Sequence, residues 1–178
     1  AHAVSASTIP APGSRRRAGA AMDLGGAFFG REDELAAIAS HFTEGARLVS
    51  LVGAGGSGKT RLARRAAAQD VEGLVVFADL TTATTVDGVC LGVAQALGIP
   101  LPGREPAAGL GEALAGHGPI LVVLDNFEQV LPAADFVGNL LSACPGLRVL
   151  ATSRAPLRLG WEREVHVEPM PVPLLGTD

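Results

Sequence analysis

Charged residues, cysteines and long apolar runs are scarce in this sequence, and each shortage excludes a class of protein. Charged residues make up only 18% of the 178 residues, and apolar residues make up 48%. This balance is too apolar and too weakly charged for intrinsic disorder. The longest aliphatic run, Ile120 to Leu124, is much shorter than the roughly 18 residues that a membrane span needs. The sequence therefore predicts one soluble globular domain without a membrane partner.

A surplus of basic residues is also missing. The formal net charge at pH 7 is −4, whereas a nucleic-acid-binding domain usually carries a basic face. We therefore expect no direct nucleic-acid binding by these residues. The two cysteines, Cys90 and Cys144, lie far apart in apolar segments and lack metal-ligand spacing. This pattern favours buried thiols in a reducing compartment over a disulfide, and it predicts a cytoplasmic protein.

The first 24 residues differ in composition from the rest of the chain. Residues 1–24 are rich in Ala, Ser, Pro, Gly and Arg and show no apolar periodicity, so they bury too little surface to offset the entropy of ordering. We predict a disordered or flexible linker over 1–24 and one domain over 25–178. The chain starts with Ala1 rather than Met and ends just after a proline-rich stretch. From these ends we expect a fragment of a larger protein.

From Phe28 onward, short apolar runs alternate with longer segments of helical periodicity. Uninterrupted apolar strands that alternate with helices are typical of a parallel sheet covered on both faces. The predicted fold class is therefore α/β, with three layers and a five-stranded parallel sheet. The expected strands are 48–52, 74–78, 120–124, 147–152 and 164–167, and the expected helices are 32–42, 59–69, 86–97, 107–115 and 132–143.

A glycine-rich loop lies between the first expected strand and the helix that follows it. Its residues fit the pattern G-x-x-x-x-G-K-[ST], in the strand-loop-helix context that this pattern requires. Glycines let successive backbone N–H groups point at phosphate oxygens, and the helix start adds the positive end of its dipole. The expected nucleotide-binding residues here are Gly53, Ala54, Gly55, Gly56, Ser57, Gly58, Lys59, Thr60 and Arg61.

The loop contains the only lysine of the chain, Lys59, against 13 arginines elsewhere. The planar guanidinium of arginine would not replace a compact ammonium inside a phosphate cradle. We expect Lys59 to contact the β- and γ-phosphates of a nucleotide and the hydroxyl of Thr60 to ligate Mg²⁺. We also expect Lys59 to be exposed in an empty loop, so that its replacement by alanine would remove binding without disturbing the fold.

The end of a buried strand supplies a second part of a phosphate site. Asp125 directly follows the apolar run 120–124, where a P-loop protein needs a carboxylate for Mg²⁺; a helix-capping role is the alternative. The next residue, Asn126, stands where many such ATPases have a second acid that polarises the attacking water. Glu128 is then the nearest candidate base, or equally an acid that stabilises the first turn of the next helix. Because Asn126 cannot accept a proton, we expect slow ATP hydrolysis.

The segment Thr152-Ser153-Arg154 ends the next expected strand. If that strand lies between the strand before the glycine-rich loop and the strand before Asp125, Arg154 would face the γ-phosphate and sense its charge. The alternative is a surface arginine in the turn before Pro156. The candidate catalytic residues are therefore Lys59, Asp125, Glu128 and Arg154, and the candidate Mg²⁺ ligands are Thr60 and Asp125.

Together with Gly30-Arg31-Glu32-Asp33-Glu34-Leu35 ahead of the loop, these motifs resemble the STAND signal-transduction ATPases. The resemblance covers about residues 28–175. It is strongest to the NB-ARC-type domain of bacterial LuxR-type and antibiotic-pathway transcriptional regulators. It implies a P-loop NTPase fold with the sheet order 2-3-4-1-5. It also implies that Arg31 lies against the nucleotide base, whereas the residues alone equally allow a charge at a helix start.

The same resemblance implies a module that ATP and ADP switch in the presence of Mg²⁺. Its partners would be the nucleotide and the other domains of a bacterial transcriptional regulator, with ATP-dependent self-association as a further property. A P-loop small-molecule kinase is the alternative enzyme, but the segment 98–111, where a lid would lie, contains one arginine, Arg104. A pseudo-ATPase that only holds nucleotide is the third hypothesis.

Overall fold

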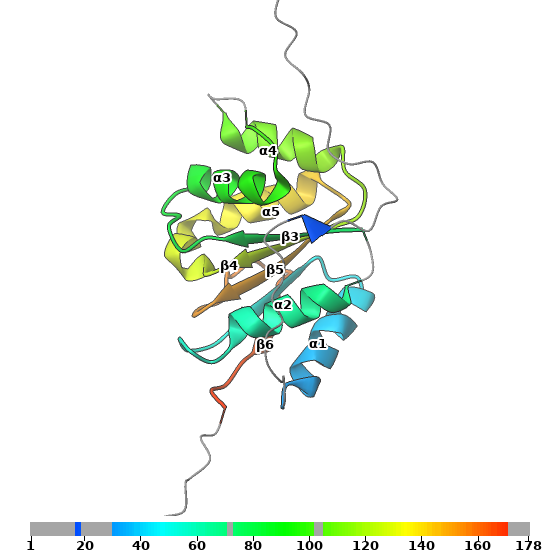
Figure 1. Cartoon of the computed structure of the whole chain (residues 1–178), viewed down its shortest axis with the longest axis vertical. Coiled ribbons are helices and arrows are strands. Elements are labelled where there is room, and N and C mark those ends of the chain that lie inside the picture. The colour runs from blue at the N-terminus through cyan, green and yellow to red at the C-terminus, as the bar shows by residue number, and fades with distance from the viewer. Residues whose placement is uncertain (1–16, 19–29, 71–72, 102–104, 171–178) are drawn as a thin grey trace, which may run out of the picture.

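A computed structural model describes residues 17–18, 30–70, 73–101 and 105–170. The expected boundary at residue 25 lies outside these residues, as do most of the expected linker and Arg104. Helices cover both faces of a central sheet, so the molecule has three layers (Figure 1). No helix within the described ranges is long and apolar enough to cross a membrane.

The sheet is parallel throughout, and it contains the five strands expected from the sequence. These are β2 (Leu48–Val52), β3 (Leu74–Asp79), β4 (Ile120–Asp125), β5 (Leu147–Ser153) and β6 (Arg163–His166). They lie in the order β3-β4-β5-β2-β6, which confirms the predicted order 2-3-4-1-5. A two-residue strand, β1 (Arg17–Ala18), pairs with the outer edge of β3. The sequence did not predict this pairing, because two residues carry no periodicity.

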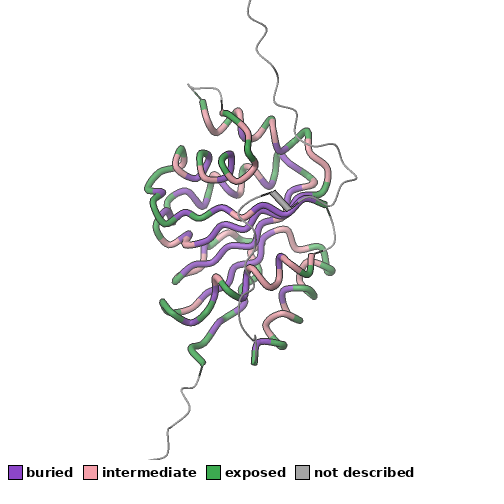
Figure 2. Tube along the Cα trace, in the orientation of Figure 1, coloured by how far each residue is buried: buried purple, intermediate pink, exposed green. Residues whose placement is uncertain are grey.

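The strands are buried because their apolar side chains face helices on both sides. Every residue of β2 and β4 is buried. The helices are α1 (Glu32–Thr43), α2 (Lys59–Gln69), α3 (Val86–Leu97), α4 (Pro106–Ala115) and α5 (Ala134–Ala143). Figure 1 shows α1 and α2 on one face of the sheet and α3, α4 and α5 on the other. Figure 2 shows the sheet as a buried layer between the two helical layers.

One expected helix is shorter than predicted. Instead of starting at Pro132, the regular helix α5 starts at Ala134, after a 3₁₀ segment η1 (Phe127–Ala133). Val130 has non-helical backbone angles inside η1. Pro132 lies in the same segment, and its ring and missing N–H are tolerated at a helix start but not inside an α-helix. The predicted start was therefore wrong by two residues.

The two cysteines are free and buried, as the sequence predicts. Burial raises the pKa of the Cys90 thiol to about 11, and it also raises the pKa of Cys144. Both thiols therefore stay protonated at neutral pH and behave as small apolar side chains.

Candidate nucleotide-binding site

The predicted site residues gather at the carboxyl edge of the sheet. In a parallel sheet the carboxyl ends of neighbouring strands meet at one edge, where ligands of open α/β sheets bind. The glycine-rich loop follows β2, Asp125 ends β4, and Arg154 follows β5. Because β5 pairs with both β2 and β4, the arrangement on which the Arg154 prediction depended is present.

The glycine-rich loop adopts a backbone that needs glycine at several places. Gly56 and Gly58 have positive φ angles of 78° and 89°, a region that residues with a Cβ rarely occupy. At Gly53, a Cβ would lie 2.2 Å from the carbonyl oxygen of Val167. Among the described residues, no side chain caps the start of α2, and Ala54, Gly55 and Gly56 are exposed. The loop and the helix start therefore fit a phosphate group.

Lys59 lies under the loop, and its exposure was predicted wrongly. The residue is only 8% exposed. Its Nζ donates hydrogen bonds to the carbonyl oxygens of Gly53 at 2.7 Å and Ala54 at 2.8 Å. The loop carbonyls thus satisfy the ammonium, which the sequence could not reveal. Burial lowers the pKa of Lys59, and the charges of Glu128, Arg154 and Asp125 act on the same pKa.

Asp125 lies at the centre of a cluster of hydroxyl groups. The residue is 3% exposed, and its Oδ1 accepts hydrogen bonds from Thr60 Oγ1 at 2.9 Å and from Thr152 Oγ1 at 2.5 Å. The backbone N–H of Asn126 in turn donates to Thr152 Oγ1 at 3.0 Å. A carboxylate beside a hydroxyl at a phosphate cradle is the donor set that Mg²⁺ takes in P-loop proteins. The two predicted ligands therefore lie together and fit the ion.

Thr152 is a functional candidate that the sequence reasoning missed. It was noted only as part of the strand end before Arg154. The sheet register pairs Leu124 with Ala151, which places the following residues, Asp125 and Thr152, side by side. The signal was available once the strand order was known, because a buried threonine one position beyond that pair must find a hydrogen-bond partner.

The side chain of Asn126 faces the end of β3. Its backbone has a positive φ of 62°, which asparagine tolerates better than most residues. Its Nδ2 donates to Thr81 Oγ1 at 2.9 Å and to Asp79 Oδ1 at 3.4 Å. Hydrogen bonds from Thr81 are the main cause of the lowered pKa of Asp79. Sequence reasoning also missed Asp79 and Thr81, and their only signal was a polar pair at a strand end.

Glu128 and Arg154 form an ion pair above the loop. Arg154 Nε lies 3.5 Å from Glu128 Oε1, and the side chains are 67% and 16% exposed respectively. Glu128 Oε2 is buried and has no hydrogen-bond partner among the described residues. A Cβ on Gly55 would lie 3.0 Å from Arg154 Nη2, so the guanidinium reaches over the loop. Glu128 lies in the first turn of η1 as well as beside the site, so both roles predicted for it remain compatible with its position.

Arg31 and Arg61 complete the predicted set. Arg31 is only 7% exposed, and its guanidinium donates to the carbonyl oxygen of Ser57 in the loop at 2.9 Å. Arg61 is exposed in the first turn of α2. Arg31 is thus tied to the loop, while its contact with a nucleotide base stays a prediction.

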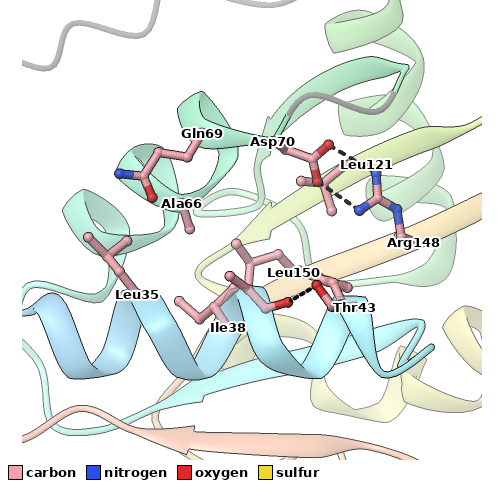
Figure 3. Close-up of a pocket in the computed structure, with 11 residues that line it drawn as sticks. Leu35, Ile38, Thr43, Ala66, Gln69, Asp70, Leu121, Arg148 and Leu150 are labelled. Carbon is pink, nitrogen blue, oxygen red and sulfur yellow. Dashed lines mark hydrogen bonds and ion pairs between the residues drawn. The ribbon is translucent and has the colours of Figure 1, made fainter.

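A separate pocket of about 190 Å³ lies between α1 and α2. Figure 3 shows Leu35, Ile38 and Leu150 lining it, with Asp70 and Arg148 at its rim. Asp70 follows the carboxyl end of α2, whereas Lys59 starts that helix. The pocket is therefore at the other end of α2 from the glycine-rich loop.

Comparison with known proteins identifies the family. A family model described as "AAA domain" matches residues 42–159, well over half of the chain. The chain therefore belongs to the AAA-domain family of P-loop NTPases, a class whose members bind ATP or ADP with Mg²⁺. The matched range includes the glycine-rich loop, Asp125, Glu128 and Arg154.

Curated relatives come from mycobacteria. A protein of Mycobacterium tuberculosis with the provisional name of an HTH-type transcriptional regulator is 42% identical over 129 residues, which are 71% of this chain. An uncharacterized protein of the same species is 34% identical over 150 residues, which are 80% of this chain. The chain spans only 14% of the length of the first relative and 37% of the second.

Solved structures support the fold. The ORC2 protein of Aeropyrum pernix, solved in ADPNP–ADP complexes, has a TM-score of 0.55 at 19% identity, over 78% of this chain and 48% of its own. A STAND protein with a tetratricopeptide repeat sensor from Pyrococcus horikoshii has a TM-score of 0.44 at 20% identity, over 79% of this chain and 23% of its own. The first likeness shows the fold alone, and the second carries no argument, so the narrower NB-ARC-type assignment stays a prediction.

Proposed function

We propose that this domain is a nucleotide-dependent regulatory switch of a larger transcriptional regulator, of the NB-ARC type within the STAND ATPases. It would bind ATP and ADP with Mg²⁺ and hydrolyse ATP slowly. The observation that carries the proposal is the convergence of Lys59 and the Thr60–Asp125 pair at the glycine-rich loop. The regulator name of the mycobacterial relative supports the cellular role, and the two free, buried cysteines support a reducing, cytoplasmic setting.

Different groups of the site would contact the phosphates and the metal ion. The ammonium of Lys59 exchanges its two carbonyl acceptors for phosphate oxygens, while the loop N–H groups and the start of α2 face the same anion. Asp125 and Thr60 would hold Mg²⁺, which would supply positive charge against the negative charge of the phosphates. Thr152 fixes the orientation of the Asp125 carboxylate by its 2.5 Å hydrogen bond.

Arg154 is the residue best placed to distinguish ATP from ADP. A ligand shifts a conformational equilibrium only through contacts that differ between the two states. ATP adds one phosphoryl group, and the exposed guanidinium of Arg154 already lies over Gly55. When Arg154 turns to the γ-phosphate, it leaves Glu128, whose carboxylate is then released from the ion pair.

Slow hydrolysis follows from the arrangement of the acids. The amide of Asn126 donates to Thr81 and Asp79, and an amide does not accept a proton from water. Glu128 is the remaining carboxylate beside Lys59, and it lies two positions beyond Asn126, the position where a second acid would polarise water. We therefore expect turnover below the roughly 1–100 s⁻¹ of protein kinases.

Isothermal titration calorimetry of the chain with Mg·ADP and Mg·ATP tests the proposal. Lys59→Ala should lose at least about 100-fold in affinity for both nucleotides, because it removes a charge-assisted contact to each. Arg163→Ala is the matched control, since it removes an exposed cation at the far end of β6. A thermal melt of each variant separates lost binding from lost folding, because Lys59 is buried. Equal affinity in wild type and Lys59→Ala would refute the proposed site.

A further inference from the structure

Arg31 joins three segments that lie far apart in the sequence. Its Nη1 donates to Glu34 Oε1 at 2.6 Å. Its Nη2 donates both to the carbonyl oxygen of Ser57 at 2.9 Å and to the carbonyl oxygen of Glu168. Ser57 belongs to the glycine-rich loop, and Glu168 lies two residues beyond β6. A single nitrogen atom therefore bridges the loop and the chain that leaves the sheet.

The segment 167–170, called the exit segment below, also packs on the loop through its backbone. The N–H of Val167 donates to the carbonyl oxygen of Val52 at 2.8 Å, directly before the loop. The carbonyl oxygen of Val167 lies where a Cβ of Gly53 would be, at 2.2 Å. At its far end, the side chain of Met170 lies 3.2 Å from the Cβ position of Gly30. The exit segment thus runs from the start of the loop to the residue before Arg31.

The chemistry of arginine suits this bridge. A guanidinium has five N–H donors in a fixed plane, so it can serve a carboxylate and two carbonyl groups at once, which a lysine cannot do with the same geometry. The Arg31 cation is buried, and Glu34 supplies its counter-charge. Burial raises the pKa of Glu34, but the hydrogen bond from Arg31, a backbone hydrogen bond and the charge of Arg31 together outweigh burial, so the pKa is lowered overall. The charge of the bridge is therefore balanced.

We propose that Arg31 is a positioning residue that couples the glycine-rich loop to the exit segment. Because Nη2 serves both carbonyl oxygens, a loop that is ordered by phosphate also fixes the guanidinium, and the guanidinium fixes Glu168. Nucleotide binding is thereby transmitted to the chain that follows β6. This inference rests on the proposed binding of nucleotide by the loop, and it names the segment whose order changes when nucleotide binds.

Hydrogen–deuterium exchange with and without Mg·ADP tests the coupling. In wild type, ADP should slow amide exchange in the loop and slow exchange at Val167 and Glu168 by about fivefold or more, the lower end of ordinary coupling between sites. At ADP concentrations that saturate each variant, which offset any loss of a contact between Arg31 and the nucleotide base, Arg31→Ala and Arg31→Lys should keep the protection of the loop and lose the protection of the exit segment. Arg163→Ala, which removes an exposed arginine, should behave as wild type.

The exchange results distinguish a failure of the coupling from a failure of the proposed nucleotide binding. Loss of exit-segment protection in both Arg31 variants, with the loop still protected, supports the coupling. Protection of the exit segment that persists in either Arg31 variant overturns it, as does a wild type in which the loop alone is protected. A wild type in which ADP protects neither segment, and which gives no binding heat, refutes the proposed function instead. If Arg31→Ala melts below the assay temperature, Arg31→Lys retains the charge and decides the question.

Discussion

The face of the sheet under α3, α4, α5 and η1 carries a larger apolar core than the face under α1 and α2. Among the described residues, 25 buried apolar residues form the first core and 12 form the second. Burial of apolar side chains is the main source of stability in a domain. We call these the major face and the minor face, and we expect the major face to contribute more to the free energy of unfolding.

The minor face compensates with polar contacts. Arg148 on β5 makes two hydrogen bonds with Asp70, at 2.8 and 3.0 Å, and its guanidinium lies 5.4 Å from the centroid of the Phe42 ring. Asp70 and Arg148 border the pocket between α1 and α2 in Figure 3, and Phe42 lines the same pocket. The bridge of Arg31 belongs to the same face. Polar contacts are directional, so they fix geometry where apolar burial alone would not.

From this comparison we expect the two faces to contribute unequally to the free energy of unfolding and to the proposed nucleotide binding. The minor face carries α2, which begins with Lys59 and Thr60, and α1, which Arg31 precedes. A change to the major-face core away from η1 should therefore affect the free energy of unfolding and leave nucleotide binding intact. A change to the minor face should affect both.

The largest expected effect comes from a matched pair of core substitutions. Leu110 on α4 and Leu62 on α2 are both 0% exposed, one in each core. Leu110→Ala and Leu62→Ala should each lower the free energy of unfolding by about 2–5 kcal/mol, because each removes buried methyl groups and leaves a cavity. Only Leu62→Ala should also lower the affinity for ADP, because Leu62 packs the helix that carries Lys59 and Thr60 into the core.

Urea unfolding and calorimetry on the same samples check this pair. A domain whose stability lies well above the lower end of the ordinary range of about 5–15 kcal/mol stays mostly folded after either change. If Leu110→Ala lowers the affinity for ADP as much as Leu62→Ala does, the two faces do not differ in their contribution to nucleotide binding.

A smaller effect is expected at Arg154, which links the two faces. Arg154 lies over the loop of the minor face and pairs with Glu128 from η1 on the major face. Arg154→Ala should weaken the binding of ATP by about 1.5–3 kcal/mol, which is roughly ten- to a hundredfold in affinity. The affinity for ADP should stay unchanged. Dissociation constants for both nucleotides measure the difference. An equal loss for ATP and ADP would mean that Arg154 does not read the γ-phosphate.

Much of this architecture was predictable from local patterns. The bounds of β2, α2 and α3 agree with the predicted segments, because apolar periodicity and glycine stops are local signals. The strand order came from the resemblance to a known family rather than from periodicity. The fold then confirmed that order.

Contacts between distant residues were not predictable. Arg31 meets Glu168 across 137 positions, and Thr152 meets Asp125 across 27, so no window of sequence contains either pair. The burial of Lys59 depends on how the loop carbonyls turn, which residue types do not specify. Asn126 was predicted only as a missing acid, because sheet pairing brings it to its partners, Asp79 at the end of β3 and Thr81 just beyond that strand.

The smallest expected effect, at Glu34, isolates one polar contact of the minor face. Burial raises its pKa, but hydrogen bonds from Arg31 and the backbone, with the charge of Arg31, lower it overall. A carboxyl group with a lowered pKa in the folded state stabilises the protein above its unfolded pKa, and this stability is lost as the pH falls through the folded pKa. Glu34→Gln should therefore lower the free energy of unfolding at pH 7 by less than about 1 kcal/mol, since the Glu34 side chain is 21% exposed and glutamine still accepts a hydrogen bond from Arg31. The difference from wild type should shrink as the pH falls below 4.5, the ordinary pKa of a glutamate side chain. Glu32→Gln is the matched control, because Glu32 is exposed in the same helical turn and shares its dipole effect. Urea unfolding at pH 7 and at acid pH measures both variants, and an equal pH dependence for the two would show that the Arg31–Glu34 pair adds nothing to the minor face.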